Sequence, residues 1–159
     1  MTKEELSSYL IAGMGKLVVD RLVELSLHDD AIPAYCLAFA GEHNTRAMKA
    51  SWLLSTRTKK DKKFPMAHQA DLLRLAKETT IGGVRRELLK ALDGVPLTEE
   101  TLGHLVAFSL MLLQDVEQDR AVRYIALKHL QRASKKYPEL KSELEQIEIY
   151  LRERTGDFP

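Results

Sequence analysis

Three related segments occur along this chain: RAMKASWLL (residues 46–54), RRELLKAL (residues 85–92) and RYIALKHL (residues 123–130). Their first arginines are 39 residues apart and then 38 residues apart. The residues four and seven positions after each arginine are apolar, which places them on one side of a helix with the arginine at its rim. These residues are Ala50, Leu89 and Leu127, followed by Leu53, Leu92 and Leu130. The same apolar stripe is therefore predicted in three helices.

A second amphipathic helix follows each segment: HQADLLRLAKE, TLGHLVAFSLMLLQD and ELKSELEQIEIYLRER. A recurrence of this length is close to the roughly 40 to 47 residues of HEAT-type repeats. One helical pair cannot bury both of its apolar faces alone, whereas stacked neighbours cover one another. We therefore predict an all-α fold, a right-handed α-α superhelix of about three to four helical hairpins.

Capping residues and helix breakers divide the chain into helices. Thr2 and Glu5 form a capping box before the first helix, and Gly13 and Gly15 break the chain after it. No segment of useful length alternates in the way of a half-exposed strand. A charged loop is predicted to extend to Phe64 and Pro65. The predicted helices cover residues 3–12, 16–28, 31–40, 45–56, 66–78, 81–92, 98–115, 120–136 and 139–154.

Composition limits the classes of function. The 159 residues suit one domain, predicted over residues 1–159 with a repeat core at about 16–155, and the net charge of +1 provides no overall attraction to nucleic acid or membrane. Cys36 is the only cysteine, which excludes an internal disulfide and predicts a buried, reduced thiol. The amino terminus lacks a secretion signal, and Leu105 to Leu113 is too short to span a bilayer, so a cytoplasmic location is expected.

The repeated segments and the leucine-rich helices after them resemble the HEAT and armadillo repeats of small bacterial α-solenoid proteins, over about residues 16–155. The basic loop from Lys59 to Lys63 departs from the family pattern, as do Leu88 and Leu89 where a small residue is expected. The resemblance implies a non-catalytic scaffold that holds a partner. Some relatives bear an adenylosuccinate lyase label, but the mobile serine loop of such lyases has no match here, which indicates a transferred name.

Basic residues supply the candidate binding site. If the repeats stack in register, the three repeated arginines form a ridge, and the basic loop adds to it. The candidate binding residues are Arg46, Arg85, Arg86, Arg123, Lys59, Lys60, Lys62 and Lys63. Phosphate contacts require such residues to converge on one surface, which is the basis of an alternative function in nucleic-acid binding. Charge runs are more often solvated or ion-paired, which weighs against nucleic acid. The leading hypothesis, based on the stacked repeats, is that the concave face lined by the second helices binds a protein partner or a second copy of the chain.

No residue set forms a convincing catalytic or metal site, and no cofactor is predicted. His68 and Asp71 are three residues apart, but two residues do not make a metal site. Trp52, compared with the tryptophans of HEAT-like DNA glycosylases, is assigned to the core because large aromatic residues usually supply packing area. An enzyme remains the third hypothesis, and it requires a deep pocket with a convergent polar set.

Overall fold

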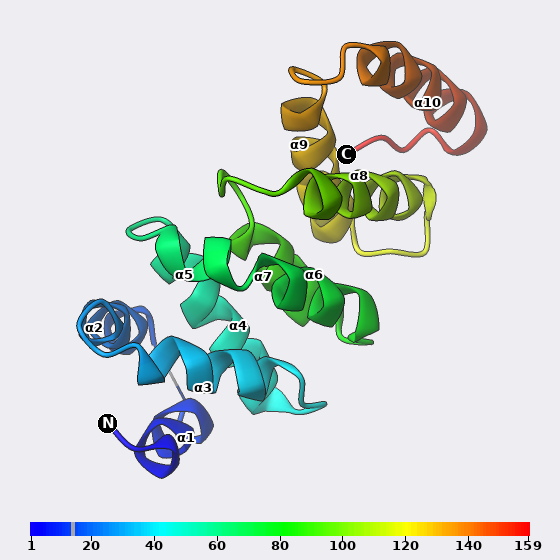
Figure 1. The fold of residues 1–159 in the computed structure, drawn as a ribbon. Coiled ribbons are helices and arrows are strands. Elements are labelled where there is room, and N and C mark those ends of the chain that lie inside the picture. The colour runs from blue at the N-terminus through cyan, green and yellow to red at the C-terminus, as the bar shows by residue number, and fades with distance from the viewer. Residues whose placement is uncertain (14) are drawn as a thin grey trace. The chain divides into compact units, whose positions relative to one another are not determined.

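The computed structural model describes residues 1–13 and 15–159. Met14, inside the predicted break between Gly13 and Gly15, lies outside the described residues. The described residues form ten α-helices and no strand (Figure 1). They are α1 (Lys3–Ile11), α2 (Lys16–Ser26), α3 (Ala31–Ala40), α4 (Thr45–Thr58), α5 (Lys63–Ala67), α6 (Gln69–Glu78), α7 (Gly82–Ala91), α8 (Glu99–Gln114), α9 (Arg120–Ala133) and α10 (Glu139–Thr155). The all-α prediction is confirmed.

The predicted caps mark the helix starts where their side chains reach the backbone. Thr2 Oγ1 accepts a hydrogen bond from the Glu5 amide (3.1 Å), and the Thr2 amide donates to Glu5 Oε2 (2.7 Å), which completes the capping box. Asn44 Oδ1 accepts from the Ala47 amide (3.1 Å) at the start of α4. The first four amides of a helix have no acceptor within the helix. These hydrogen bonds satisfy two of the four at α1 and one of the four at α4.

The predicted charged loop was partly wrong. Helix α4 continues to Thr58, and the short helix α5 begins inside the segment that was predicted as a loop and ends within the predicted helix 66–78. Thr58 Oγ1 donates to the carbonyls of Leu54 (3.1 Å) and Ala91 (3.0 Å), which anchors the last turn of α4 against the end of α7. Pro65 of α5 is buried, so tertiary packing stabilises structure in a segment whose charge suggested a loop.

The chain divides into two compact units, residues 1–97 and residues 98–159. In the first unit, α3 packs against α4 and α6 against α7, and the two hairpins meet where α4 lies beside α7 (Figure 1). Helices α1 and α2 both pack on the α3–α4 hairpin. The assignment of residues 1–159 to one domain stays a prediction.

In the second unit, α8 and α9 form a hairpin, and α10 packs on α9 (Figure 1). Its core is a cluster of leucines from these three helices, with Phe158 packed against it from the segment after α10. The cluster consists of Leu113, Leu127, Leu130, Leu144 and Leu151.

The repeated segments lie on α4, α7 and α9, and their apolar stripe is buried in all three helices. The buried positions are Ala50, Leu53, Leu89, Leu92, Leu127 and Leu130. The pairing differs from the prediction, because α4 packs with the preceding helix α3 and α9 packs most extensively with the preceding helix α8. The connection between α3 and α4 is short, at residues 41–44, whereas the path from α4 to α6 contains α5. The repeated segment is therefore the second helix of its hairpin.

Candidate interaction surface

Two of the three repeated arginines bind the preceding helix of their own hairpin. Arg85 on α7 donates its Nε–H to the carbonyl of Ala76 near the end of α6 (2.8 Å). Arg123 on α9 donates its Nε–H to the carbonyl of Leu113 near the end of α8 (3.1 Å). Arg123 also forms an ion pair with Asp157 (2.8 Å) and is only 1% exposed. Both guanidinium groups therefore satisfy carbonyls that have no intrahelical donor.

Arg46, the third repeated arginine, has different partners. It forms an ion pair with Glu42 (2.7 Å) and donates to Ser7 Oγ of α1 (2.7 Å). Its guanidinium carbon also lies 4.5 Å from the centre of the Phe39 ring, within the range of a cation–π contact. The structure gives all three arginines contacts inside their own unit, and a ligand-binding role for them stays a prediction.

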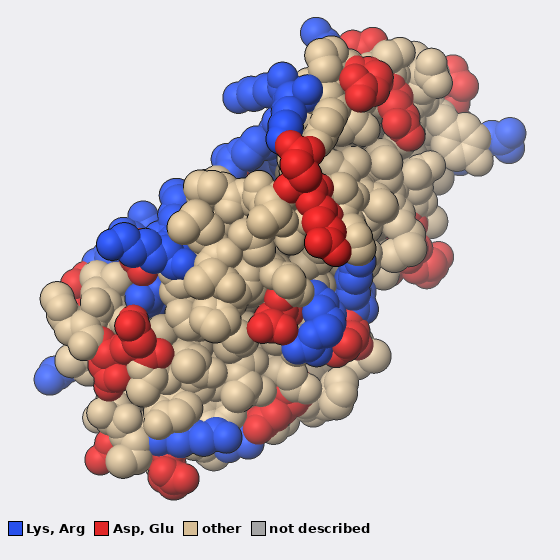
Figure 2. Space-filling view, in the orientation of Figure 1, with Lys and Arg blue, Asp and Glu red and all other residues tan. Residues whose placement is uncertain are grey.

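The lysines of the basic loop lie at the turn between α4 and the start of α5: Lys59, Lys60, Lys62 and Lys63. Figure 2 shows Lys and Arg side chains gathered on the surface beside this turn. Lys60 pairs with Glu24 of α2, and Lys62 donates to the carbonyl of Asp93 (3.4 Å). Within residues 1–13 and 15–159, Lys59 and Lys63 form no ion pair. The positive charge of Lys63 nevertheless helps to lower the pKa of Asp61.

Helices α4 and α7 run parallel and touch along their length. A Cβ atom on Gly83 would lie 2.8 Å from the Met48 sulfur, which shows how closely the helices approach near their starts. Further along, Ser55 of α4 donates to the carboxylate of Glu87 of α7. At the far end, the Thr58 hydroxyl donates to the Ala91 carbonyl. In these three contacts the residue numbers increase together on α4 and α7, so the two helices run in the same direction.

This parallel arrangement brings two exposed stripes to one side. The two helices touch at Ser55 of α4 and Glu87 of α7. Because both α-helices are right-handed and run in the same direction, the residue after Ser55 and the residue before Glu87 lie on the same side of the pair. The side chains on this side are half-buried or exposed, and we call them the α4–α7 face: Lys49, Trp52, Thr56 and Lys59 of α4, with Arg86 and Lys90 of α7. Four of these side chains are basic and none is acidic. Sequence reasoning identified Lys59 and Arg86 but missed Lys49 and Lys90.

The buried Glu87 forms ion pairs with two basic side chains of α7, Arg86 and Lys90. It is only 3% exposed and accepts the Ser55 hydroxyl on one carboxylate oxygen. Its other oxygen lies 3.2 Å from Arg86 Nε and 3.4 Å from Lys90 Nζ. A buried carboxylate requires paired charge and hydrogen bonds, and Glu87 has both. The Arg86 and Lys90 side chains therefore both lie against Glu87 at the edge of the face.

The remaining candidate residues, His68 and Asp71, contact different neighbours. The His68 ring stacks on Phe64, with centres 4.3 Å apart, and Asp71 lies 3.4 Å from Arg74. Trp52, expected in the core, is half-buried on the α4–α7 face. Across residues 1–13 and 15–159, no three His, Cys, Asp or Glu side chains gather in a way that could hold a metal ion.

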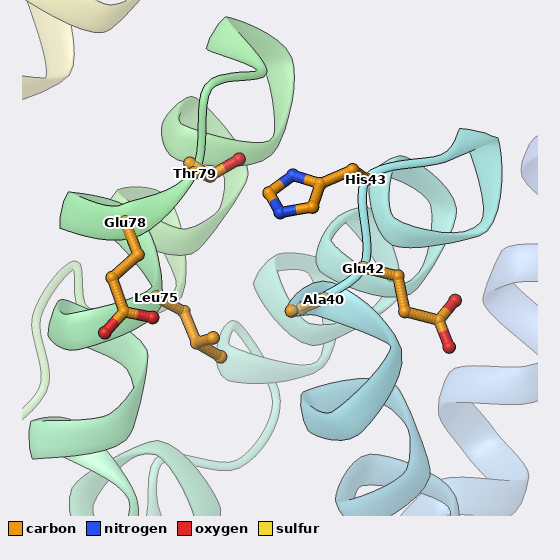
Figure 3. A pocket seen from close by; sticks show the side chains of 7 residues that line it. Ala40, Glu42, His43, Leu75, Glu78 and Thr79 are labelled. Carbon is orange, nitrogen blue, oxygen red and sulfur yellow. The ribbon is translucent and has the colours of Figure 1, made fainter.

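A hollow of about 70 Å³ opens between the ends of α3 and α6 (Figure 3). His43 points across it toward Thr79, whereas Glu42 points away from the hollow and the Glu78 carboxylate lies beside Leu75. Glu42 pairs with Arg46, and Glu78 pairs with Arg74 (3.1 Å). The polar groups of this hollow do not converge, so it does not supply the set that the enzyme hypothesis requires.

A family model of the HEAT repeat domain matches residues 7–154, which include the repeated helices. The chain belongs to the HEAT repeat family. This HEAT repeat chain matches no curated protein and no solved structure. None of the HEAT helices in the described residues is both long enough and apolar enough to cross a membrane. The predicted class of stacked HEAT-like hairpins is confirmed.

Proposed function

We propose that this HEAT repeat protein is a non-catalytic interaction module that holds an acidic segment of a partner protein on the α4–α7 face. The observation that carries the proposal is the composition of this face, where Lys49, Lys59, Arg86 and Lys90 lie on the same side as the half-buried Trp52. Basic groups around an aromatic anchor match an acidic segment that also presents an apolar side chain. Helical repeats use extended surfaces of this kind for binding.

Electrostatics supports an acidic partner in particular. Arg86 and Lys90 are already oriented by Glu87, so an incoming carboxylate meets donors that lose little freedom on binding. The Lys59 side chain is exposed at the end of the face, where an acidic group of a partner can reach it. Such charges increase the association rate and make binding sensitive to salt.

Nucleic acid is the alternative ligand, favoured by the cluster of lysines at the start of α5. Phosphate binding by these lysines would depend steeply on salt, and several aromatic residues would be needed to stack successive bases. The α4–α7 face offers one aromatic ring, Trp52. This difference favours a protein segment over a nucleic-acid strand.

Trp52 allows a direct test, because it is the only tryptophan of the chain and lies on the proposed face. A 15-residue peptide rich in Glu, with one Leu and one Phe, is titrated into the protein while the Trp52 emission spectrum is recorded. We expect a saturable spectral shift at low salt. The triple variant Lys49→Ala, Arg86→Ala, Lys90→Ala should weaken binding roughly tenfold or more, as expected when several charge-assisted contacts are lost.

The matched control removes two exposed charges elsewhere in the first unit, Lys16→Ala with Arg21→Ala on α2, and should bind as the wild type does. No emission shift, or equal losses in the two variants, would overturn the proposal. If a duplex or single-stranded oligonucleotide shifts the emission and the acidic peptide does not, the nucleic-acid alternative replaces it.

A further inference from the structure

The segment after α10 folds back on the second unit. Gly156 ends α10 in the left-handed conformation, with φ of 67°, a backbone state that glycine adopts without strain. This reversal directs Asp157 and Phe158 toward α9, and Figure 1 shows the C end beside α8 and α9. We call Asp157 and Phe158 the tail.

Two arginines of α9 hold the tail carboxylate. Arg120 Nη1 lies 2.7 Å from Asp157 Oδ1, and Arg123 Nη1 lies 2.8 Å from Asp157 Oδ2. The arginines are three positions apart, so they project from one side of α9. Each carboxylate oxygen is therefore paired with a different guanidinium group.

Apolar contacts hold the residue that follows. Phe158 packs against the leucine cluster of the second unit, which includes Leu127 and Leu151. The Arg152 guanidinium lies 5.3 Å from the centre of the Phe158 ring. Arg120 Nη2 also donates to the Phe158 carbonyl (3.3 Å). The tail is thus bound as a peptide ligand is bound, with a charged anchor next to an apolar one.

The tail does not satisfy its site completely. Arg123 is 1% exposed, and its Nη2 is buried with no acceptor in the described part of the chain. Asp157 still exposes 40% of its side chain, and Phe158 is only half-buried. A buried guanidinium group is stable only with an anion beside it, so the site always requires a carboxylate or similar group. The incomplete fit leaves room for a better ligand.

We infer that Arg120, Arg123 and the leucine cluster form a second binding site, for a partner segment in which an acidic residue precedes an aromatic one, and that the tail occupies this site as an internal competitor. The incoming carboxylate replaces Asp157 between the two arginines, and the incoming ring replaces Phe158 on the leucines. The site is separate from the α4–α7 face, so this inference does not depend on the proposed function.

Competition by the tail determines how the site behaves. A ligand attached by a short connection acts at an effective concentration of about 1 mM. An external segment of similar sequence therefore binds the intact chain weakly, and weakening the tail exposes the site. Any change that releases the tail would increase binding.

The test uses the full chain with Asp157→Ala and Phe158→Ala, and the probe is a labelled peptide with the sequence of residues 152–159, RERTGDFP. We expect fluorescence anisotropy to show binding to the variant roughly tenfold tighter than to the wild type, because the internal competitor is lost. A probe with Asn in place of Asp should not bind. Adding Arg120→Ala to the variant should also weaken probe binding, since Arg120 is exposed and its replacement leaves the core intact.

The double variant is checked by circular dichroism, and the probe should raise its melting temperature. If the double variant does not fold, the single variant Phe158→Ala serves in its place, because it keeps the counter-charge of Arg123. Equal affinity for wild type and variant, or equal affinity of the Asp and Asn probes, would overturn the inference. Trp52 emission should not change with this probe, so a failure here is distinguishable from a failure at the α4–α7 face.

Discussion

Arg85 of α7 donates its Nε–H to the backbone carbonyl of Ala76, nine residues earlier in α6, at 2.8 Å. Arg123 of α9 makes the same contact with Leu113, ten residues earlier in α8, at 3.1 Å. The last carbonyls of a helix have no donor within the helix, and a cation is favourable there. In α7 and α9, the arginine of the repeated segment thus closes its hairpin by capping the helix before it.

Replacing Arg85 by Ala should therefore destabilise the protein by about 1.5–3 kcal/mol, the range for hydrogen bonds to charged groups. Arg85 also donates to the Thr79 carbonyl, so Lys should rescue only in part, because one ammonium group cannot reproduce the guanidinium fork. Urea unfolding measures the change. Arg74→Ala, at an exposed ion pair on α6, should cost less than about 1 kcal/mol, and equal losses for both variants would contradict the capping role.

Cys36 should be inert in the folded protein. It is buried in α3, and burial raises the pKa of its thiol to about 12, against a smaller opposing effect of Arg57. The thiolate is the reactive form, so almost none is present at pH 8. An aromatic disulfide reagent should release no thiol signal from the native protein and one equivalent per chain in denaturant. Release from the native protein at the rate of a free thiol would contradict this prediction.

The ion pair at the end of α4 should make stability depend on acid pH. A hydrogen bond from the Lys63 amide (3.0 Å) lowers the pKa of Asp61 most; partial burial opposes it, and Arg57 at 2.9 Å lowers the pKa further. This stabilisation is present above the unfolded pKa of about 3.9 and is lost as the pH falls through the lower folded value. The advantage of wild type over Asp61→Asn in urea unfolding should therefore shrink between pH 5 and pH 2, as estimated from that pKa. Parallel stability curves would show that Asp61 contributes no such linkage.

Gly103 should be a position where a larger residue stabilises the fold. It lies inside α8, is exposed, and a Cβ atom there would meet no heavy atom within 4 Å. Ala should raise the free energy of unfolding by roughly 0.5–1 kcal/mol, because glycine loses more backbone freedom on folding. Gly156→Ala is the contrasting control. Its φ of 67° should make the same change cost roughly 1–2 kcal/mol, although nothing crowds that position either.

The helices and their buried stripe could be predicted because both depend on local pattern. Leu53 and Leu92 recur at helical spacing, and this spacing alone determines which side of each helix avoids water. The caps at Thr2 and Asn44 are local for the same reason, since each side chain bonds an amide three residues ahead. Helix α5 was not predicted because tertiary packing, in which Pro65 is buried, stabilises it, whereas the charged residues around it suggested a loop.

The candidate surface could be predicted only in part. Arg46, Arg85 and Arg123 are equivalent in sequence, yet Arg46 contacts Ser7 and Phe39, whereas the other two cap a preceding helix. Lys49 and Lys90 belong to one face only because α4 and α7 lie side by side. That relation joins residues 41 positions apart, and no local pattern records it.

By itself, then, the sequence determined that this chain forms helices with one apolar side and that these helices recur as HEAT-like units. The tertiary structure alone decided which charges reach the surface. Arg123 lies 1% exposed against Asp157, whereas Arg86 is held at the surface above the buried Glu87. The physical reason is that the burial of a charged side chain depends on which neighbouring helix packs against it. The spacing of apolar residues in the sequence describes only the helix to which that side chain belongs.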